Sequence, residues 1–195
     1  MLERGSRPVS GDLMSAILRV FPLPPTARPL ESYRGVQLGE ELFKKALGEL
    51  GYPGFAYLKS RLSLNPAELL LFALDSDELD ARVTEALPWL PFHFPDMNWG
   101  WLTVEAKSRD RQNRLAYVTL LASDVAQLRG ETELAESLRR RVANLERSRL
   151  ANEDTLAKNS MSQAERKWLR SHRSPAATHW NLLTDLKAED LEHVF

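Results

Sequence analysis

The chain has 195 residues, which is enough for one domain with a buried core. Apolar residues make up 43% and charged residues 27%, close to the globular average, and this excludes a disordered or collagen-like chain. The formal charge is -1 and cysteine is absent, so the total charge indicates neither nucleic acid nor membrane as a partner, and disulfides, thiolate metal sites and a cysteine nucleophile are excluded.

Membrane insertion is not expected from the hydropathy pattern. The longest apolar run, at 69–74, is far shorter than the roughly 18 residues that a membrane span needs. The N-terminal stretch does not match a signal peptide, because Asp12 and Arg19 interrupt its apolar residues and no small-residue cleavage site follows. We therefore expect a cytoplasmic protein.

The N-terminal part is predicted to be a semi-detached extension. Residues 1–11 are polar, and apolar residues at helical spacing then predict a short helix over 12–21. Four prolines follow within eight residues and predict an extended connector over 22–36, because proline cannot continue a helix. The predicted domains are an N-terminal helix with a proline-rich connector at 1–35 and an α-helical domain at 36–195.

The middle of the chain is predicted to hold several short helices. We predict their positions from apolar residues at helical spacing, from N-cap residues at their starts and from proline or glycine at their ends. The expected helices cover 37–50, 54–62 and 66–74, followed by one that Ser76 or Asp77 caps and that ends at Leu87, and one that Asn98 caps and that runs to about Lys107. Three tryptophans, two phenylalanines and three prolines lie between 88 and 101, so we expect the core to be centred there.

A helical hairpin is the clearest structural signal in the chain. Apolar residues spaced by three and four predict helices over 111–129 and 132–150, which Gly130 separates. A capping box at Ser162–Glu165 predicts a further helix, and a short one is expected at 187–193. The predicted fold class is all-α, a compact multi-helix bundle with a central antiparallel helical hairpin.

No motif of a common catalytic centre is present. The sequence lacks a P-loop, a glycine-rich dinucleotide turn and a G-x-S-x-G nucleophile elbow. The histidines at 93, 172, 179 and 193 form no i, i+4 pair that could hold a metal ion, and the acidic residues at 75–80 are typical of a solvated helix start. We expect no catalytic residue, no metal site and no cofactor.

One short pattern leaves an enzymatic alternative open. Five residues separate Arg166 from His172 and also Arg173 from His179. This spacing resembles the R-x(4-6)-H element of helical HEPN ribonucleases, whose arginine and histidine converge at a dimer cleft on the scissile phosphate. Here lysine or serine follows the arginine, where that family often has asparagine or aspartate. A HEPN-like ribonuclease is therefore the competing hypothesis, and a helical structural subunit of a larger bacterial complex is a third.

Charge is segregated along the chain although its total is close to zero. Ten basic and four acidic residues lie between Arg139 and Arg173, a local net charge of +6, and the segments on either side are acidic. Such a basic segment can bind phosphates, an acidic partner or its own acidic helices, or it can be a solvated helix face. The candidate residues for binding nucleic acid or an acidic partner are Arg139, Arg140, Arg141, Arg166, Lys167 and Arg170.

The C-terminal segment from Trp180 to Phe195 is acidic and partly apolar. This composition is typical of a segment that lies in the groove of a partner protein. The candidate partner-binding residues are Trp180, Leu182, Leu183, Leu186 and Leu191.

Two stretches carry a resemblance to known proteins. They are EALPWLPFHFPDMNWGWLTVEAKSRDRQNRLAYV at 85–118 and SQAERKWLRSHRSPAATHWNLLTDL at 162–186. Their aromatic and proline punctuation resembles uncharacterised helical proteins of bacterial plasmids and mobile elements, some of which look like antitoxins or regulators of two-gene modules. The resemblance implies a protein that binds a toxin and also its own promoter. The sequence thus predicts a non-catalytic helical binding or regulatory protein with a protein partner, and with nucleic acid as a second ligand.

Overall fold

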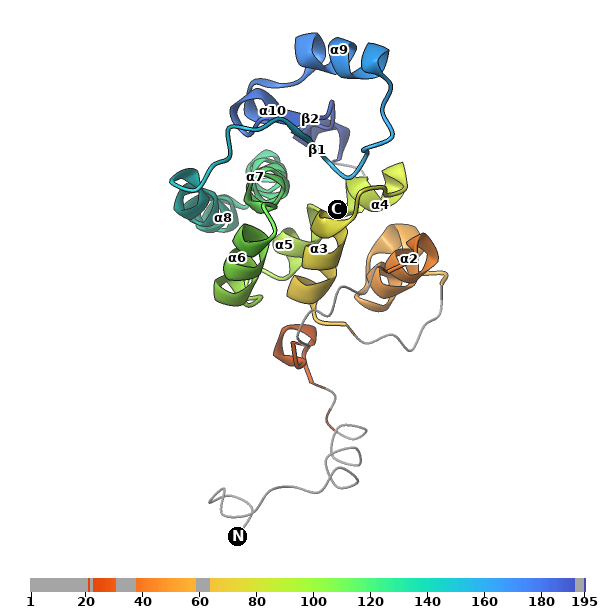
Figure 1. The fold of residues 1–195 in the computed structure, drawn as a ribbon. Coiled ribbons are helices and arrows are strands. Elements are labelled where there is room, and N and C mark those ends of the chain that lie inside the picture. Colours follow the sequence, from red (N-terminus) through yellow and green to blue (C-terminus); the bar gives the residue numbers. More distant parts are fainter. Residues whose placement is uncertain (1–20, 22, 31–37, 59–63, 192–194) are drawn as a thin grey trace.

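Helices dominate the computed structural model, which confirms the predicted all-α class (Figure 1). The structure describes residues 21, 23–30, 38–58, 64–191 and 195. The helix predicted over 12–21 lies outside this part except for Phe21, and the predicted domain boundary near residue 35 also lies outside it.

The described part of the proline-rich connector packs on the helical body. It contains a single 3-10 turn, η2 (Pro25–Ala27), followed by extended backbone. Arg28 Nη1 donates to the carbonyl oxygen of Leu64 at 3.0 Å, and Asn65 Nδ2 donates to the carbonyl oxygen of Arg28 at 2.8 Å. Because Asn65 also caps helix α3 (Pro66–Asp75), one side chain starts a helix and holds the connector.

The first two helices of the predicted domain have different outcomes. The helix predicted over 37–50 is confirmed as α2 (Glu40–Glu49). The helix predicted over 54–62 is wrong for residues 54–58, which form only the end of a 3-10 turn, η3 (Pro53–Phe55), and a turn and bend after it, whereas 59–62 lie outside the described residues. This turn folds back so closely on α2 that a Cβ at Gly48 would collide with the carbonyl oxygen that ends η3.

Four short helices form the middle of the body. They are α3 (Pro66–Asp75), α4 (Ala81–Ala86), α5 (Trp89–His93) and α6 (Trp99–Ser108). Asn98 caps α6 as predicted. Helix α4 starts later than predicted, because the side chain of Asp80, and not that of Ser76 or Asp77, accepts a hydrogen bond from its first turn.

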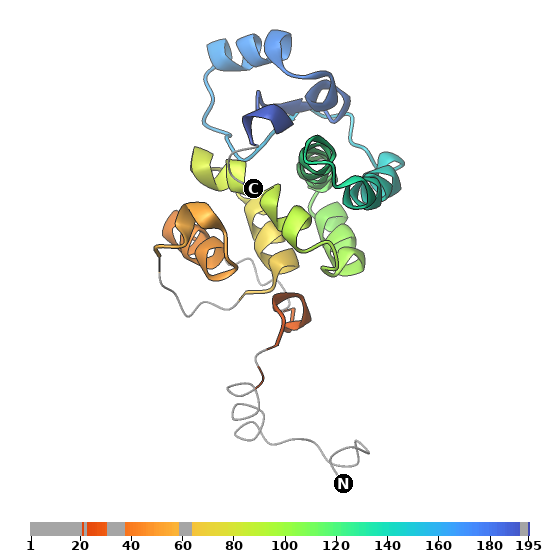
Figure 2. The same cartoon turned by 180° about the vertical axis from the view of Figure 1, so that it is seen from behind.

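The predicted hairpin is confirmed, and its first helix lies inside the body whereas its second lies at the edge (Figure 1). The hairpin consists of α7 (Gln112–Leu128) and α8 (Thr132–Glu146), and Gly130 turns the chain with a φ of 78°. Helix α8 ends before residue 150, because Leu150 leaves the helix and its N–H donates to Asn113 Oδ1 at 2.9 Å. Helix α7 packs against α8, α5, α6 and the C-terminal segment (Figures 1 and 2).

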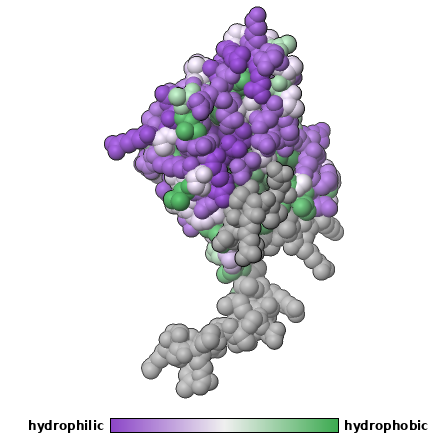
Figure 3. Space-filling view, viewed as in Figure 1, coloured by the Kyte–Doolittle hydropathy of each residue, from purple (hydrophilic) through white to green (hydrophobic). Residues whose placement is uncertain are grey.

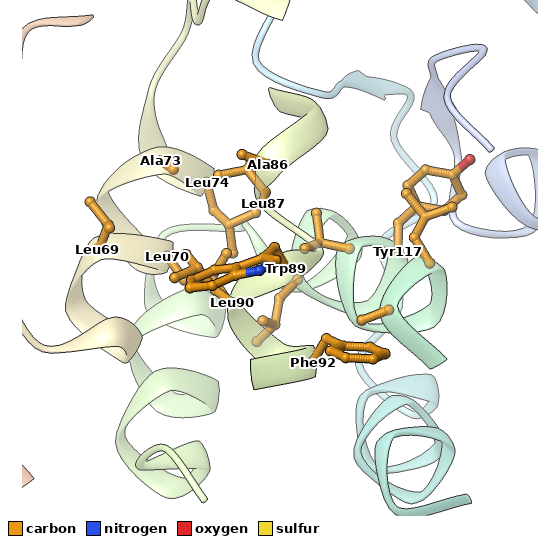
Figure 4. Close-up of a cluster of buried hydrophobic side chains, with 14 of the residues drawn as sticks. Leu69, Leu70, Ala73, Leu74, Ala86, Leu87, Trp89, Leu90, Phe92 and Tyr117 are labelled. Atoms are coloured by element: carbon orange, nitrogen blue, oxygen red, sulfur yellow. The ribbon is translucent and has the colours of Figure 1, made fainter. Parts of the chain in front are cut away.

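The core is centred where the sequence predicted it. Trp89, Leu90, Phe92 and Trp99 are all buried. In Figure 4 the indole of Trp89 lies between α3 and α5, with Leu70 and Leu90 beside it. This packing joins the short helices into one body.

The chain after the hairpin forms short elements at one end of the molecule (Figure 1). They are β1 (Asp154–Thr155), α9 (Gln163–His172), α10 (Pro175–His179), β2 (Leu182–Leu183) and η4 (Ala188–Asp190). The two strands, which the sequence did not predict, pair in parallel. The capping box of α9 is confirmed, whereas the helix predicted over 187–193 is reduced in the described residues to the single 3-10 turn η4.

The C-terminal segment is part of the core, and this corrects its predicted role. Trp180 is 1% exposed, Leu182, Leu183 and Leu191 are 0% exposed, and Leu186 packs partly buried against the same cluster. Trp180, Leu182 and Leu191 fill the core of their own chain and so cannot at the same time lie in the groove of a partner. Leu183 and Leu186 also line a surface cleft.

Candidate functional site

A buried arginine attaches the C-terminal elements to the helical body. Arg114 Nε and Nη2 donate to the carboxylate of Asp154 at 2.7 and 2.8 Å. Its Nη1 donates to the carbonyl oxygens of Leu74 and Ser76, both at 2.8 Å. Burial alone would raise the pKa of Asp154, but the hydrogen bond and charge of Arg114 outweigh this effect and hold the pKa below its usual range. Arg114 therefore fixes β1 against α7 and the end of α3.

Asn113 makes a second attachment beside the first. Its Nδ2 donates to the carbonyl oxygens of Leu150 and Trp180 at 3.0 and 2.8 Å. The chain before β1 and the chain before β2 are thus held by one buried side chain. These hydrogen bonds place both strands on α7.

The loop between β1 and α9 is bound to the segment that connects α3 and α4. The N–H of Leu79 donates to the carbonyl oxygen of Ala157 at 2.9 Å, and Asn159 Nδ2 donates to Asp77 Oδ1 at 2.7 Å. Glu78 accepts hydrogen bonds from the N–H and the hydroxyl of Ser160. The acidic run at 75–80, which the sequence indicated as a solvated helix start, therefore supports this loop.

Helix α9 is fastened by a surface carboxylate. Arg170 Nη2 donates to Glu153 Oε1 at 2.7 Å, and Arg173 lies 3.8 Å from the same carboxylate. The hydrogen bond from Arg170 lowers the pKa of Glu153. Arg166 donates to the carbonyl oxygen of Asn159 at 3.0 Å. These contacts fix α9 to the chain on either side of β1.

A cleft of about 350 Å³ lies between α4, the β1–α9 loop, α9 and β2. Its apolar lining includes Leu79, Leu156, Met161, Leu169, Leu183 and Leu186, and Trp168 borders it. The surrounding surface is mostly hydrophilic on the face shown in Figure 3, where apolar residues form only small separate patches. An apolar hollow of this kind on a polar surface is a candidate binding site.

Trp168 is the exposed aromatic residue of this cleft. Its side chain is 50% exposed although it belongs to a helix that packs on the body. The ring of His172 stacks on it with a centroid distance of 4.3 Å and an interplanar angle of 7°. A half-exposed indole that a second ring holds in place is typical of a protein interface.

The wall of the cleft opposite α9 has a strained backbone. Ala157 has a φ of 54°, a left-handed conformation that costs free energy for alanine.

The rim of the cleft is acidic. Glu78, Glu85, Glu165 and Asp185 line it together with one base, Lys158. Glu165 belongs to the capping box of α9, and Glu78 binds the loop as described above. Glu85 and Asp185 have no hydrogen bond or ion pair with any other residue that the structure describes. These two carboxylates are therefore available to a ligand.

Sequence reasoning did not identify this cleft. Its residues lie between 78 and 186 in the chain, and only the tertiary fold brings them together. One signal was present in the helix predicted from the capping box at Ser162–Glu165. Its residues are mostly charged or polar, and it nevertheless carries Trp168.

The predicted basic residues of α8 do not form one patch. Successive residues of an α-helix point about 100° apart, so three consecutive arginines must diverge. Arg139 lies 3.5 Å from Asp124, and the guanidinium of Arg141 lies 5.6 Å from the ring centre of Trp99. Arg140 shares the outward face of α8 with Arg147, and neither has an interaction with another described residue. Arg140 and Arg147, the residue directly after α8, are therefore exposed without a partner among the described residues.

The predicted basic residues of α9 are brought together on one short helix. Arg166 and Arg170 are engaged by backbone and by Glu153, whereas Lys167 is exposed without a partner in the described part of the chain. Helix α8 lies beside α7 at a different part of the molecule (Figures 1 and 2). The six predicted residues therefore do not make a continuous basic surface.

The arginine and histidine pairs are separated within this chain. Arg166 and His172 bind different partners, since His172 Nδ1 lies 2.8 Å from the carbonyl oxygen of Trp168. Arg173 donates to the carbonyl oxygen of Leu182, whereas His179 Nε2 lies 3.0 Å from Glu146. In the described residues neither arginine contacts its histidine.

A second hollow, of about 700 Å³, lies between α7, the start of α10 and η4. Two of its polar groups, on Tyr117 and Asp124, are used by the fold. Tyr117 donates its hydroxyl to the carbonyl oxygen of Leu186 at 2.6 Å. Burial raises the pKa of Asp124, which is paired with Arg139. No tryptophan of the described residues lines this hollow, in contrast to the cleft between α4 and α9.

Among the described residues no cluster of three or more histidine, cysteine or carboxylate side chains could hold a metal ion. No helix in that part of the chain is long and apolar enough to cross a bilayer. No protein-family model, no curated protein and no solved structure matches the chain. The resemblance to antitoxin-type proteins therefore stays a prediction.

Proposed function

We propose that this chain is a non-catalytic helical binding protein of the cytoplasm that recognises a partner protein through the cleft under α9. The observation that carries the proposal is the half-exposed Trp168 beside an apolar hollow. Partly buried aromatic residues with apolar neighbours supply most of the binding free energy in protein interfaces. The packing of α9 keeps this residue in place before a partner arrives, which lowers the entropy cost of binding.

The non-catalytic part of the proposal rests on the histidines. His93 stacks on Trp89, His172 stacks on Trp168, and His179 pairs with Glu146. Each of these three rings has a partner within the fold. Ser171 Oγ lies 3.0 Å from His172 Nδ1, but this hydroxyl donates to the carbonyl oxygen of Trp168 at 2.9 Å and is thus used within α9. The HEPN-like alternative has less support, because its arginines bind backbone carbonyls and not the histidines.

The most specific form of the proposal makes the partner the toxin of a two-gene module. The partner protein would then stop the growth of the cells in which it is expressed without this chain. Co-expression with this chain would restore growth, whereas co-expression with a Trp168→Ala variant would not. If the partner is harmless, the antitoxin form is lost and the binding function remains.

Site-specific photocrosslinking in the native cells tests the binding function. A photoreactive residue replaces Thr84 or Met161, which line the cleft, or Val104, which is 65% exposed on α6 and serves as the control. We expect one protein to be crosslinked from both cleft positions and not from Val104. That protein, once purified, should bind the wild-type chain and not the Trp168→Ala variant. Adducts that are the same at all three positions, or none at the cleft, contradict the proposal.

Nucleic-acid binding is a second candidate function. It is favoured by Arg140 and Arg147, which lie on one outward face of α8 and have no partner in the described part of the chain. Two such arginines can bind successive phosphates, and the binding should weaken as salt increases. A gel-shift titration of DNA and RNA at low salt, with the charge-reversed pair Arg140→Glu and Arg147→Glu, tests it. Equal shifts for the variant and the wild type, or no shift at all, contradict it.

A further inference from the structure

The charge and shape of the cleft define the partner segment that fits it. We infer that the cleft binds a basic, partly apolar segment of the partner protein, with an arginine or lysine side chain against the ring of Trp168. This inference rests on the proposed function, because it names the chemistry of the partner at the same site.

Charge complementarity is the first argument. Four carboxylates and one ammonium group line the cleft, and Glu85 and Asp185 have no partner among the described residues. A neutral or acidic segment would cover these carboxylates without replacing the water that now solvates them. A basic segment replaces that water with ion pairs, so the rim favours a cationic ligand and repels phosphates.

The aromatic ring is the second argument. His172 stacks on Trp168 and fixes the orientation of the indole, while the ring borders the acidic cleft. A guanidinium or ammonium group is attracted to the face of an indole, and nearby carboxylates add to this attraction. The combination of an indole with Glu165 and Asp185 at one cleft therefore favours arginine or lysine.

The volume and the apolar floor are the third argument. A cleft of about 350 Å³ accommodates a few side chains and not a folded domain. Its leucines would be left in contact with water by a purely polar cation. The ligand must therefore supply aliphatic or aromatic side chains next to its basic ones, as an extended or helical peptide does.

Selection from a library of random 12-residue peptides on the full wild-type chain tests the inference. Binding of the enriched peptides is then measured with three variants. Trp168→Ala removes the ring, and the double variant Glu85→Gln with Asp185→Asn removes the two unpaired carboxylates without changing their shapes. The matched control is Glu133→Gln with Glu136→Gln, which removes two exposed carboxylates of α8.

We expect the enriched peptides to carry net positive charge and apolar residues. Their dissociation constants should rise about tenfold in the Glu85/Asp185 variant at low salt and change less than about twofold in the control. Peptides that need Trp168 but are not basic, or that bind the Glu85/Asp185 variant unchanged, overturn this inference and leave the proposed function standing. If no enriched peptide loses affinity in Trp168→Ala, the proposed function itself fails.

Discussion

Arg114 shows how a single residue can position a binding site that it does not touch. Its guanidinium joins α7 to the end of α3 and to β1, and the loop that forms one wall of the cleft begins directly after β1. The side chain of Arg114 is only 1% exposed, so water cannot replace the hydrogen bonds that it donates. Removing such a group leaves buried acceptors without donors.

The Arg114→Met variant should therefore lose stability. We expect the free energy of unfolding to fall by about 3 kcal/mol, because two carbonyl groups and Asp154 lose their donor. Urea denaturation followed by circular dichroism measures the change. The control Arg147→Met lies on the outward face of α8 and should change stability by less than about 0.5 kcal/mol. Similar losses in both variants would show that Arg114 is not a structural anchor.

His93 gives the fold a pH dependence. Burial lowers its pKa, and a hydrogen bond with the backbone of Trp89 opposes this effect only in part. The folded state therefore favours the neutral ring of His93. Its contribution to the free energy of unfolding is fully present above the ordinary pKa of 6.5. This contribution is lost as the pH falls from 6.5 through the lowered pKa of the folded state.

The His93→Gln variant should remove this dependence. Between pH 7 and pH 5 the melting temperature of the wild type should fall more than that of the variant, since glutamine does not bind a proton in this range. Thermal unfolding at closely spaced pH values measures both slopes. Parallel curves for the two proteins would exclude a contribution from His93.

At the scale of elements, α7 joins the parts of the fold, because it packs against α8, α5, α6 and η4. The turn between α7 and α8 depends on a left-handed residue, Gly130, with a φ of 78°. A Cβ at this position would meet nothing within 4 Å, so any cost of adding one comes from the backbone conformation and not from a clash.

The Gly130→Ala variant should be destabilised by about 1 kcal/mol because alanine is strained in the left-handed region. Gly100 is the control, since it lies within α6 and a Cβ there would meet only Asn98 Oδ1, at an ordinary contact distance of 3.6 Å. Chemical denaturation of both variants measures the difference. The account of the turn fails if Gly100→Ala costs as much as Gly130→Ala.

Elements with local signals could be predicted from the sequence. The hairpin, α3 and the capping box of α9 follow from side-chain spacing and from caps that lie within three residues. The helix predicted over 54–62 could not be corrected in this way, because the contact of η3 with Gly48 is tertiary.

The candidate binding sites depend on the directions in which the side chains point, and a count of charges along the sequence does not give these directions. The count of arginines at 139–141 was right, but the turn of the helix sends them to Asp124, to solvent and to Trp99. The polar residues Gln112 to Arg114 lie in the first turn of α7, and no local pattern marks them as buried. They are buried because their partners, such as Asp154 and Leu150, come from distant parts of the chain.

At the scale of the whole molecule, two tryptophans of the C-terminal part have opposite roles. Trp180 is 1% exposed and fills the core next to α7, whereas Trp168 is 50% exposed at the cleft. The sequence predicted Trp180 as a contact for a partner protein. The structure shows that Trp180 is instead buried among apolar residues of its own chain.

Substitution of these two residues should separate folding from binding. Trp180→Ala should lower the free energy of unfolding by about 3 to 5 kcal/mol, because it leaves a large cavity in the core. Trp168→Ala should change stability by less than about 1 kcal/mol, since half of the side chain is already in contact with water. Denaturation of both variants measures this, and a Trp168→Ala variant that unfolds as easily as Trp180→Ala would contradict the assignment of Trp168 to the surface.

Hydrogen–deuterium exchange measures most directly where the partner lies. The full chain is compared alone and in the presence of a saturating concentration of the partner protein that photocrosslinking identifies. We predict slower exchange of backbone amides in the loop at 156–161, in α9 and at 183–186, with α8 unchanged. Protection confined to α8 around Arg140 and Arg147, with none at the cleft, would contradict the account.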